Sequence, residues 1–299
     1  MKVYEGSDIR NIGIVGHRDC GKTSVLASLL YTAGATNRFT SVDEGNTVTD
    51  FDEEEINRKV TITSSLAFVE WNKTKINFID TPGYNIFIND AQAALIAAGT
   101  ALVVVDAVSG AEVQTEKGWS FAKEYGQARV VLLNKMDRER ADFSRALADV
   151  QAVLSEKAVA VQLPIGSEKD FRGVVDLVHE KAYLYEPDGD GKGKETDIPA
   201  EMAAAVESAR ESLIEAVADC DDDLLAEYLE NLTLPQEKVL TGLAKGILAQ
   251  KIFPVMCMSA VHNIGSGALL DFLQTFSPAP TVRNEFQAEG GVTRKMSDS

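Results

Sequence analysis

An eight-residue loop, Gly16 to Thr23, has the residue types and spacing of a phosphate-binding loop. It matches the pattern G-x-x-x-x-G-K-[ST], follows an apolar run at Ile12 to Val15 and precedes the helix-forming stretch Ser24 to Tyr31. In that setting, backbone N–H groups can surround phosphate oxygens, the Lys22 ammonium can reach the outer phosphates and the Thr23 hydroxyl can bind Mg²⁺. A chance glycine-rich turn is the alternative, which the flanking elements disfavour. The predicted contact residues are His17, Arg18, Asp19, Cys20, Gly21, Lys22, Thr23 and Ser24.

A second group of polar residues has the chemistry to select a guanine base. Asn134, Lys135 and Asp137 follow a predicted buried strand. The Asp137 carboxylate can accept hydrogen bonds from guanine N1–H and the 2-amino group, while the Lys135 stem can lie over the base. Adenine has neither donor, and a polar group left unpaired in such a pocket costs about 1–3 kcal/mol. Ser259 and Ala260, after the last predicted strand, would offer backbone contacts to guanine O6.

A third group lies where a magnesium ion and a γ-phosphate would be held. Asp80 ends a predicted strand and can hold the hydration shell of Mg²⁺, and the Gly83 N–H can sense the γ-phosphate. Thr61 is the candidate for a second hydroxyl ligand, so the predicted metal ligands are Thr23 and Thr61. Phosphoryl transfer needs little more than positioning and charge neutralisation, which these residues and Lys22 can supply.

The elements that must position these groups alternate between strands and helices. This alternation predicts an α/β fold of the P-loop GTPase type, with a mostly parallel sheet, helices on both faces and ligands at the carboxyl ends of the strands. A hairpin with a turn at Asn72 to Thr74 is expected within it. The predicted strands are Val60 to Trp71, Lys75 to Ile79, Ala101 to Val105, Ala128 to Leu133, Val159 to Pro164 and Ile252 to Met258, and the predicted helices are Ile86 to Ala98, Val113 to Tyr125, Phe143 to Leu154 and Gly267 to Phe276.

Two stretches depart from the alternating pattern. Thr36 to Arg58 has no clean periodicity, and we interpret it as a mobile segment that covers a nucleotide. Residues 160–250 read as an inserted α+β subdomain, with small β elements at Val174 to Leu177 and Ala182 to Tyr185 and an exposed turn at Pro187 to Lys194. Helices follow at Met202 to Ala216, where the apolar residues recur at steps of 3 and 4, and at Asp222 to Leu229 and Gln236 to Ala249.

The predicted domains are therefore a nucleotide domain made of 1–159 and 251–280, the insertion at 160–250, and a linker at 281–299 that leads to a further domain. The formal net charge is −17, which disfavours a chain that wraps nucleic acid by itself. Between Gly166 and Gly246 there are 20 acidic and 8 basic side chains, either a solvated surface or a face for a basic partner.

Hydrophobic runs and cysteine spacing limit the classes of protein to which the chain can belong. No apolar run reaches the roughly 20 residues of a membrane helix and no signal-peptide pattern is present, so we expect no membrane partner and a cytoplasmic location. Cys20, Cys220 and Cys257 form no C-x-x-C pair, so neither a zinc site nor a disulfide framework is predicted. Cys20 is either a redox-sensitive thiol or, as we favour, a small residue at a variable position of the loop.

These segments together resemble the five guanine-nucleotide motifs of the translational GTPases. The motifs are the phosphate loop, Arg58 to Ile62, Asp80 to Gly83, Asn134 to Asp137, and Ser259 with Ala260. The inserted helices and three short stretches look like elongation factor G in particular; the stretches are Ala141 to Phe143, Gln162 to Gly166 and Gly173 to Leu177. The resemblance covers nearly the whole chain. It implies an N-terminal GTPase domain with its insertion, as a fragment of a longer chain in which a β-barrel domain comes next.

The resemblance also implies cofactors, partners and roles. GTP or GDP and Mg²⁺ would be bound, and the ribosome would be the partner through large-subunit rRNA and the ribosomal stalk protein, with a monomeric factor. The catalytic residues would be Asp19, Lys22, Thr61 and Tyr84. The family carries a His where this chain has Tyr84, an apolar residue where it has Arg18, and a Gly where it has Lys59. These departures resemble the divergent paralogues of elongation factor G.

A phenol with a pKa near 10 cannot become cationic near neutral pH as an imidazole can, although its hydroxyl can orient water. The leading hypothesis is a GTP-hydrolysing elongation factor stimulated by the ribosome. The alternative is a switch that senses GTP against GDP and hydrolyses slowly because of Tyr84. The ribosome-protection class shares this core but generally lacks so long an insertion. A separate hypothesis is that Arg18 stacks on Tyr84 or neutralises developing charge, instead of pointing to solvent.

Overall fold

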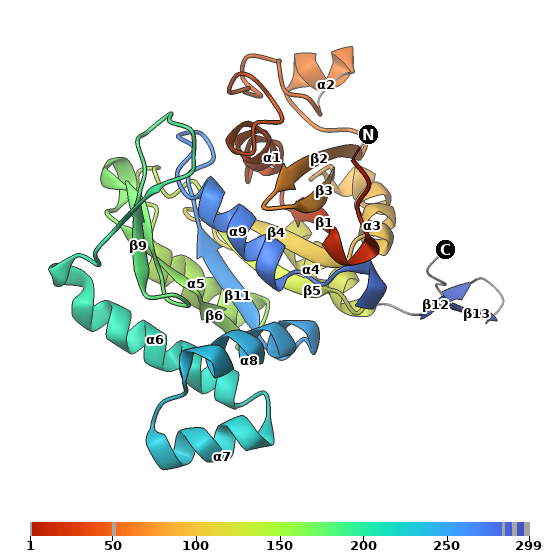
Figure 1. Cartoon of the computed structure of the whole chain (residues 1–299). Helices are drawn as coiled ribbons and strands as arrows, with labels where there is room; N and C mark the ends of the chain where they lie inside the picture. Colours follow the sequence, from red (N-terminus) through yellow and green to blue (C-terminus); the bar gives the residue numbers. More distant parts are fainter. Residues whose placement is uncertain (1, 50–51, 283–284, 289–291, 296–299) are drawn as a thin grey trace.

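A seven-stranded sheet forms the centre of the computed structural model, which describes residues 2–49, 52–282, 285–288 and 292–295 (Figure 1). Its strand order is β2-β3-β1-β4-β5-β11-β6, and only β2 runs antiparallel to its neighbour. The predicted α/β fold of the P-loop GTPase type is confirmed. The strands are β1 (Ile9–Gly16), β2 (Ser65–Trp71), β3 (Thr74–Asp80), β4 (Thr100–Asp106), β5 (Ala128–Asn134), β6 (Ala158–Ala160) and β11 (Phe253–Cys257).

Helices cover both faces of this sheet, which is why β4 and β5 are buried along their whole length. Helices α1 and α9 pack together on one face, and α3 and α4 lie on the other. The edge strand β2 instead alternates between buried and exposed residues, as expected for a strand with one solvated face. The helices of this domain are α1 (Lys22–Thr32), α2 (Glu53–Arg58), α3 (Ile88–Ala97), α4 (Val113–Glu124), α5 (Phe143–Val153) and α9 (Ser266–Phe276).

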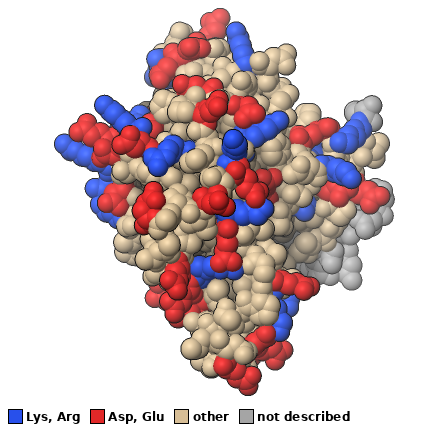
Figure 2. Space-filling model, turned by 60° about the vertical axis from the view of Figure 1, so that its left-hand side comes forward, with Lys and Arg blue, Asp and Glu red and all other residues tan. Residues whose placement is uncertain are grey.

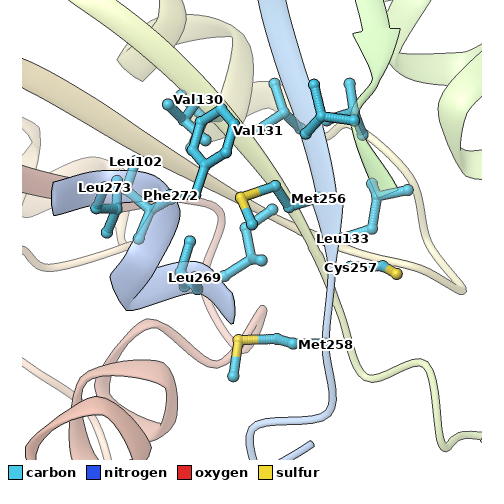
Figure 3. Packing of buried hydrophobic residues seen from close by; sticks show 14 of the residues in the cluster. Leu102, Val130, Val131, Leu133, Met256, Cys257, Met258, Leu269, Phe272 and Leu273 are labelled. Carbon is cyan, nitrogen blue, oxygen red and sulfur yellow. The ribbon is translucent and has the colours of Figure 1, made fainter. Parts of the chain in front are cut away.

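Part of the hydrophobic core lies where α9 packs over the sheet (Figure 3). Leu269, Phe272 and Leu273 of the helix point toward strand residues that include Leu102 and Met256. On β11 the neighbouring Cys257 points to the opposite face, because successive side chains of a strand alternate. Both faces of the central strands are thus fixed by packing, and their carboxyl ends are held at one edge.

The insertion lies between β6 and β11. It begins with an antiparallel sheet of order β10-β9-β8-β7 and continues with three helices. Its apolar helical stripe is confirmed, since Val206 and Leu213 are buried and Met202, Ala209 and Ala216 pack against the core. The elements are β7 (Gln162–Ile165), β8 (Gly173–Asp176), β9 (Lys181–Leu184), β10 (Lys194–Thr196), α6 (Ala203–Ala218), α7 (Asp222–Asn231) and α8 (Gln236–Leu248).

Several predicted elements differ from the structure. The strand expected at Val60 to Trp71 begins only at Ser65, because a buried carboxylate binds backbone N–H groups upstream of that residue. The strand expected at Val159 to Pro164 is two strands, one in each sheet. Thr36 to Arg58 is not wholly irregular, since it contains α2. Further differences include the strand β10, a 3-10 turn at Asn85–Phe87 ahead of α3, and the strands β12 (Glu285–Ala288) and β13 (Val292–Lys295) in the expected linker.

The hairpin between β2 and β3 is confirmed. Asn72 and Lys73 form its two-residue turn with φ of 44° and 69°, the left-handed conformation that a type I′ turn requires at both positions. The linker also includes 283–284, 289–291 and 296–299, and the predicted mobile segment includes 50–51; these lie outside the described residues.

Acidic side chains are visible at the lower end of the molecule, where Figure 1 places α7, with few basic ones among them (Figure 2). The negative charge counted in the insertion is thus presented on its surface. Across the part of the chain that the structure describes, no helix is both long and apolar enough to cross a membrane.

Candidate nucleotide-binding site

A cavity of about 430 Å³ opens at the carboxyl ends of the central strands. This volume lies in the range of small-molecule sites. Its walls come from the phosphate loop, the stretch before β2, the turn after β3 and the loop after β5. Residues that line it include Arg18, Lys22, Thr61, Gly83, Tyr84 and Lys135. Predicted contacts that lie far apart in the sequence therefore meet in one cavity.

The phosphate loop wraps around the Lys22 side chain. The Lys22 ammonium is buried and donates to the carbonyl oxygens of Gly16, at 3.2 Å, and His17, at 3.0 Å. Helix α1 begins at Lys22 because Gly21 takes a φ of +94° before it, and a Cβ at Gly21 would lie 2.5 Å from Asn134 Nδ2. Glycine is thus required at that position, and the open N–H groups of the helix start face the cavity.

The three residues predicted around the metal lie in direct contact. The Thr23 hydroxyl donates to Asp80 Oδ2 at 2.7 Å, and the two hydroxyl oxygens of Thr23 and Thr61 are 3.0 Å apart. All three side chains are buried. Mg²⁺ favours oxygen ligands and keeps several waters, so this donor set beside a phosphate loop fits the ion. Thr23 and Thr61 would bind it directly and Asp80 would hold its waters, while the ion would neutralise phosphate charge.

Gly83 closes the phosphate end of the cavity. A Cβ there would run into Lys22 Nζ and would lie 2.8 Å from the Arg18 backbone nitrogen. Only glycine fits so close to the loop, which leaves the Gly83 N–H near the outer phosphate position.

The base end is built around Asn134. Its Nδ2 donates to the Cys20 carbonyl at 2.9 Å and its Oδ1 accepts from the Ala260 N–H at 3.1 Å, so it joins the phosphate loop to the last loop. Lys135, at a φ of +67°, donates to the carbonyl of Asp19 and, at 2.7 Å, to Asp106 Oδ2. The three segments that would surround a nucleoside are therefore tied to one another.

Asp106 is a site residue that the sequence prediction missed. Burial opposes its charge, but the hydrogen bond from Lys135 and backbone N–H groups outweigh burial and lower the pKa of its carboxyl. Its position at the end of β4, beside the ends of β1 and β5, was a usable sign, since strand-end carboxylates meet at this edge.

Asp137 carries an unsatisfied buried acceptor. Its Oδ1 is buried and has no hydrogen-bond partner among the described residues, whereas its Oδ2 lies 4.0 Å from His262 Nε2. A buried carboxylate oxygen without a donor costs free energy unless a ligand supplies one. Guanine N1–H and the 2-amino group are donors of that kind. His262, which also approaches Asp188 of the insertion at 3.0 Å, is a second residue that the sequence prediction missed.

Glu55 is the third missed residue, and it lies on α2. It is fully buried, and its Oε1 accepts from the backbone N–H groups of Ile62, at 2.9 Å, and Thr63, at 3.1 Å. These bonds hold the stretch that carries Thr61. Nothing in the acidic run Glu53 to Glu55 indicated which carboxylate turns inward.

The other predicted contacts divide into residues that line the cavity and residues that lie behind its wall. Asp19 and Ser24 line it, whereas the residues that do not line it are His17, Cys20, Asp80, Asp137, Ser259 and Ala260. Cys20 is buried, and burial raises the pKa of its thiol, which disfavours a reactive thiolate. His17 Nε2 lies 3.4 Å from Glu112 Oε1. Ser24 lines the cavity, and buried Ser259 accepts the His262 N–H on its hydroxyl at 3.3 Å. The loop residue Asp19 has a φ of +59° and an exposed side chain.

Sheet topology, phosphate loop and base end together define a P-loop protein of the GTPase kind, with a cavity for a guanine nucleotide. Residues 7–279 match the family of the elongation factor Tu GTP-binding domain, so the chain belongs to that family. Among solved structures it is similar to a protein of Thermus thermophilus, with 32% sequence identity and a TM-score of 0.86. The match covers 93% of this chain and 41% of the Thermus protein. This chain therefore spans about two fifths of that protein's length.

Proposed function

We propose that this chain is the GTP-binding and GTP-hydrolysing part of a translation elongation factor of the elongation factor G kind. The observation that carries the proposal is the contact of Thr23, Thr61 and Asp80 beside Lys22, because it joins the parts that phosphoryl transfer needs. The large insertion between β6 and β11 supports the elongation factor G kind.

The proposed ligands are GTP or GDP with Mg²⁺. The buried Asp137 Oδ1, which has no donor among the residues that the structure describes, supports guanine over adenine. An Asp137→Asn variant tests this directly. It replaces an acceptor with a donor, so GTP binding should weaken at least tenfold while xanthosine triphosphate, which carries an oxygen at C2, should gain affinity. Equal loss of both nucleotides would argue against a guanine contact at Asp137.

The proposed partner is the ribosome, through large-subunit rRNA and the stalk protein, with a monomeric cytoplasmic factor. The acidic insertion supports a basic partner face there. GTP turnover by the full natural chain, with and without ribosomes, tests this role. Ribosome-stimulated turnover supports it, and turnover that ribosomes leave unchanged contradicts it.

The second candidate function is a binding switch that senses GTP against GDP and hydrolyses slowly. Tyr84 favours it, because its phenol lines the phosphate end of the cavity, where a protonatable imidazole would help catalysis. A Tyr84→His variant separates the two functions. Slow wild-type turnover that rises in the His variant supports the switch, whereas fast wild-type turnover with ribosomes rejects it.

A further inference from the structure

The Arg18 backbone lies at the phosphate end of the cavity. A Cβ on Gly83 would come within 2.8 Å of Arg18 N and 2.9 Å of Arg18 Cα, and would also run into Lys22 Nζ. The Arg18 side chain is therefore attached beside Gly83 and the Lys22 ammonium, the two groups expected to face the outermost phosphate. Among the residues of the phosphate loop, it is the one that carries a guanidinium.

The Arg18 guanidinium is held over an aromatic ring. Its Cζ lies 5.5 Å from the centroid of the Tyr84 ring, within the range of a cation–π contact. Its Nε lies 4.0 Å from Asp19 Oδ2, and 55% of the side chain is exposed. No described residue accepts a hydrogen bond from this guanidinium. Its N–H donors are therefore available to a ligand at the mouth of the cavity.

Three of the other cations that line the cavity are bound to carboxylates within the protein, and a fourth, Arg138, belongs to the loop after β5 at the base end. Arg58 pairs with Glu54, Lys59 pairs with Asp43, and Lys135 is held by Asp106. Each of these would have to give up a partner to reach a phosphate. Arg18 gives up only a long ion pair to its neighbour Asp19. It can keep its contact with the Tyr84 ring while it donates hydrogen bonds, because stacking uses the face of the guanidinium and donation uses its edge.

We infer that Arg18 is a catalytic residue that binds the γ-phosphate and the β–γ bridging oxygen during GTP hydrolysis, with the Tyr84 ring as its positioning group. In the reaction, a water oxygen bonds to the γ-phosphorus while the bond from that phosphorus to the bridging oxygen breaks. The electron pair of that bond stays on GDP, and the water proton ends on inorganic phosphate. Negative charge grows on the bridging oxygen, where a guanidinium already in place stabilises it. This inference rests on the proposed GTPase function.

The first test is single-turnover GTP hydrolysis by the full natural chain without ribosomes. Removal of one such donor costs about 100-fold in rate. Arg18→Ala should lose about that factor, and Arg18→Lys should recover little of it, because an ammonium lacks the planar fork. The control is Arg172→Ala, which removes an exposed arginine of the insertion and should hydrolyse GTP at the wild-type rate.

The second test is binding rather than turnover. GDP with aluminium fluoride imitates the transferred phosphoryl group, and its affinity can be compared with that of GDP alone by fluorescence of a labelled nucleotide. Arg18→Ala should keep GDP affinity within about twofold and lose the gain that aluminium fluoride gives the wild type. Retained GDP affinity also shows that the variant is folded.

The third test separates the Tyr84 ring from its hydroxyl. Tyr84→Phe keeps the ring that positions Arg18, so it should lose less of the hydrolysis rate than Tyr84→Ala does. The Tyr84→Ala variant combined with Arg18→Ala should be no slower than Arg18→Ala alone. Additive losses, or an Arg18→Ala variant as fast as the wild type, would overturn the inference and leave the proposed GTPase intact. A wild-type chain that binds no guanine nucleotide or does not hydrolyse GTP would overturn both.

Discussion

Glu55 offers a sharp test of how the structure holds Thr61 in place. Its buried carboxylate binds the backbone N–H groups of Ile62 and Thr63, immediately after Thr61. Its neighbour Glu54 is exposed and pairs with Arg58 one helical turn away. Glu55→Ala should therefore loosen the Thr61 stretch, whereas Glu54→Ala, which removes the same group one residue earlier, should leave it held.

The magnitude follows from the two hydrogen bonds. A bond to a charged acceptor contributes about 1.5–3 kcal/mol, so the pair is worth about 3–6 kcal/mol. Ile62 is half-buried and Thr63 is exposed, so water can replace part of what is lost. We expect the local opening free energy to fall by about 2 kcal/mol, a factor of roughly 30. The exposed Glu54 pair contributes about 0.3–0.5 kcal/mol, a factor of roughly 2.

Native-state hydrogen exchange at the Ile62 and Thr63 amides measures this opening. Both amides should exchange about 30-fold faster in Glu55→Ala and at most about twofold faster in Glu54→Ala. Thr61 is a proposed ligand of the Mg²⁺ ion that binds together with GTP. In Glu55→Ala, GTP affinity should therefore fall more than GDP affinity, and Glu54→Ala should show no such difference. Equal exchange in the two variants would refute the assignment of Glu55 as the anchor of this stretch.

The other predictions concern titratable groups. The hydrogen bond to Asp176 raises the pKa of His179 in the folded protein. The stability that protonated His179 contributes is therefore fully present below the unfolded pKa of about 6.5, and it is lost as the pH rises through the folded pKa. The urea midpoint of the wild type should therefore fall between pH 5.5 and pH 8.5, and it should fall less in His179→Gln. An equal fall in the two proteins would contradict this. Burial raises the thiol pKa of Cys20, Cys220 and Cys257 alike, but Cys20 and Cys257 are buried whereas Cys220 is only half-buried and is therefore the most accessible. Iodoacetamide at pH 8 should modify Cys220 first, as read by peptide mass spectrometry, and faster modification of Cys20 would refute the burial argument.

The convergence of the motif residues could be predicted because short motifs at the ends of parallel strands meet at one edge of the sheet. Thr23 and Asp80 are 57 residues apart, yet their contact follows from the parallel pairing of β1 with β3. The inward turn of Glu55 has no such rule behind it. Glu53, Glu54 and Glu55 have the same side chain and the same charge, so the sequence does not distinguish them. Only the packing of the folded chain determines which of the three is buried.

Central strands were predictable from their apolar runs, whereas the exact ends of the edge strands were not. Thr61 to Ser64 has the composition of a strand, but Glu55 competes for the backbone N–H groups that strand pairing would use. Val159 to Pro164 reads as one apolar run, although the chain changes sheets near Val161. Hydrophobic periodicity indicates which residues are buried, but it does not indicate to which sheet a buried strand belongs.

The insertion also contacts the base end of the nucleotide cavity. The Asp188 N–H donates to the His262 carbonyl at 3.0 Å, and Asp188 Oδ1 lies 3.0 Å from the His262 ring, whose other nitrogen faces Asp137. Next to it, Asn263 donates to the Gly189 carbonyl at 2.9 Å. The turn of the insertion therefore supports the loop that approaches Asp137, the carboxylate proposed to select guanine. Displacement of that turn would break its bonds to the loop and alter the environment of Asp137 without a change in the phosphate loop.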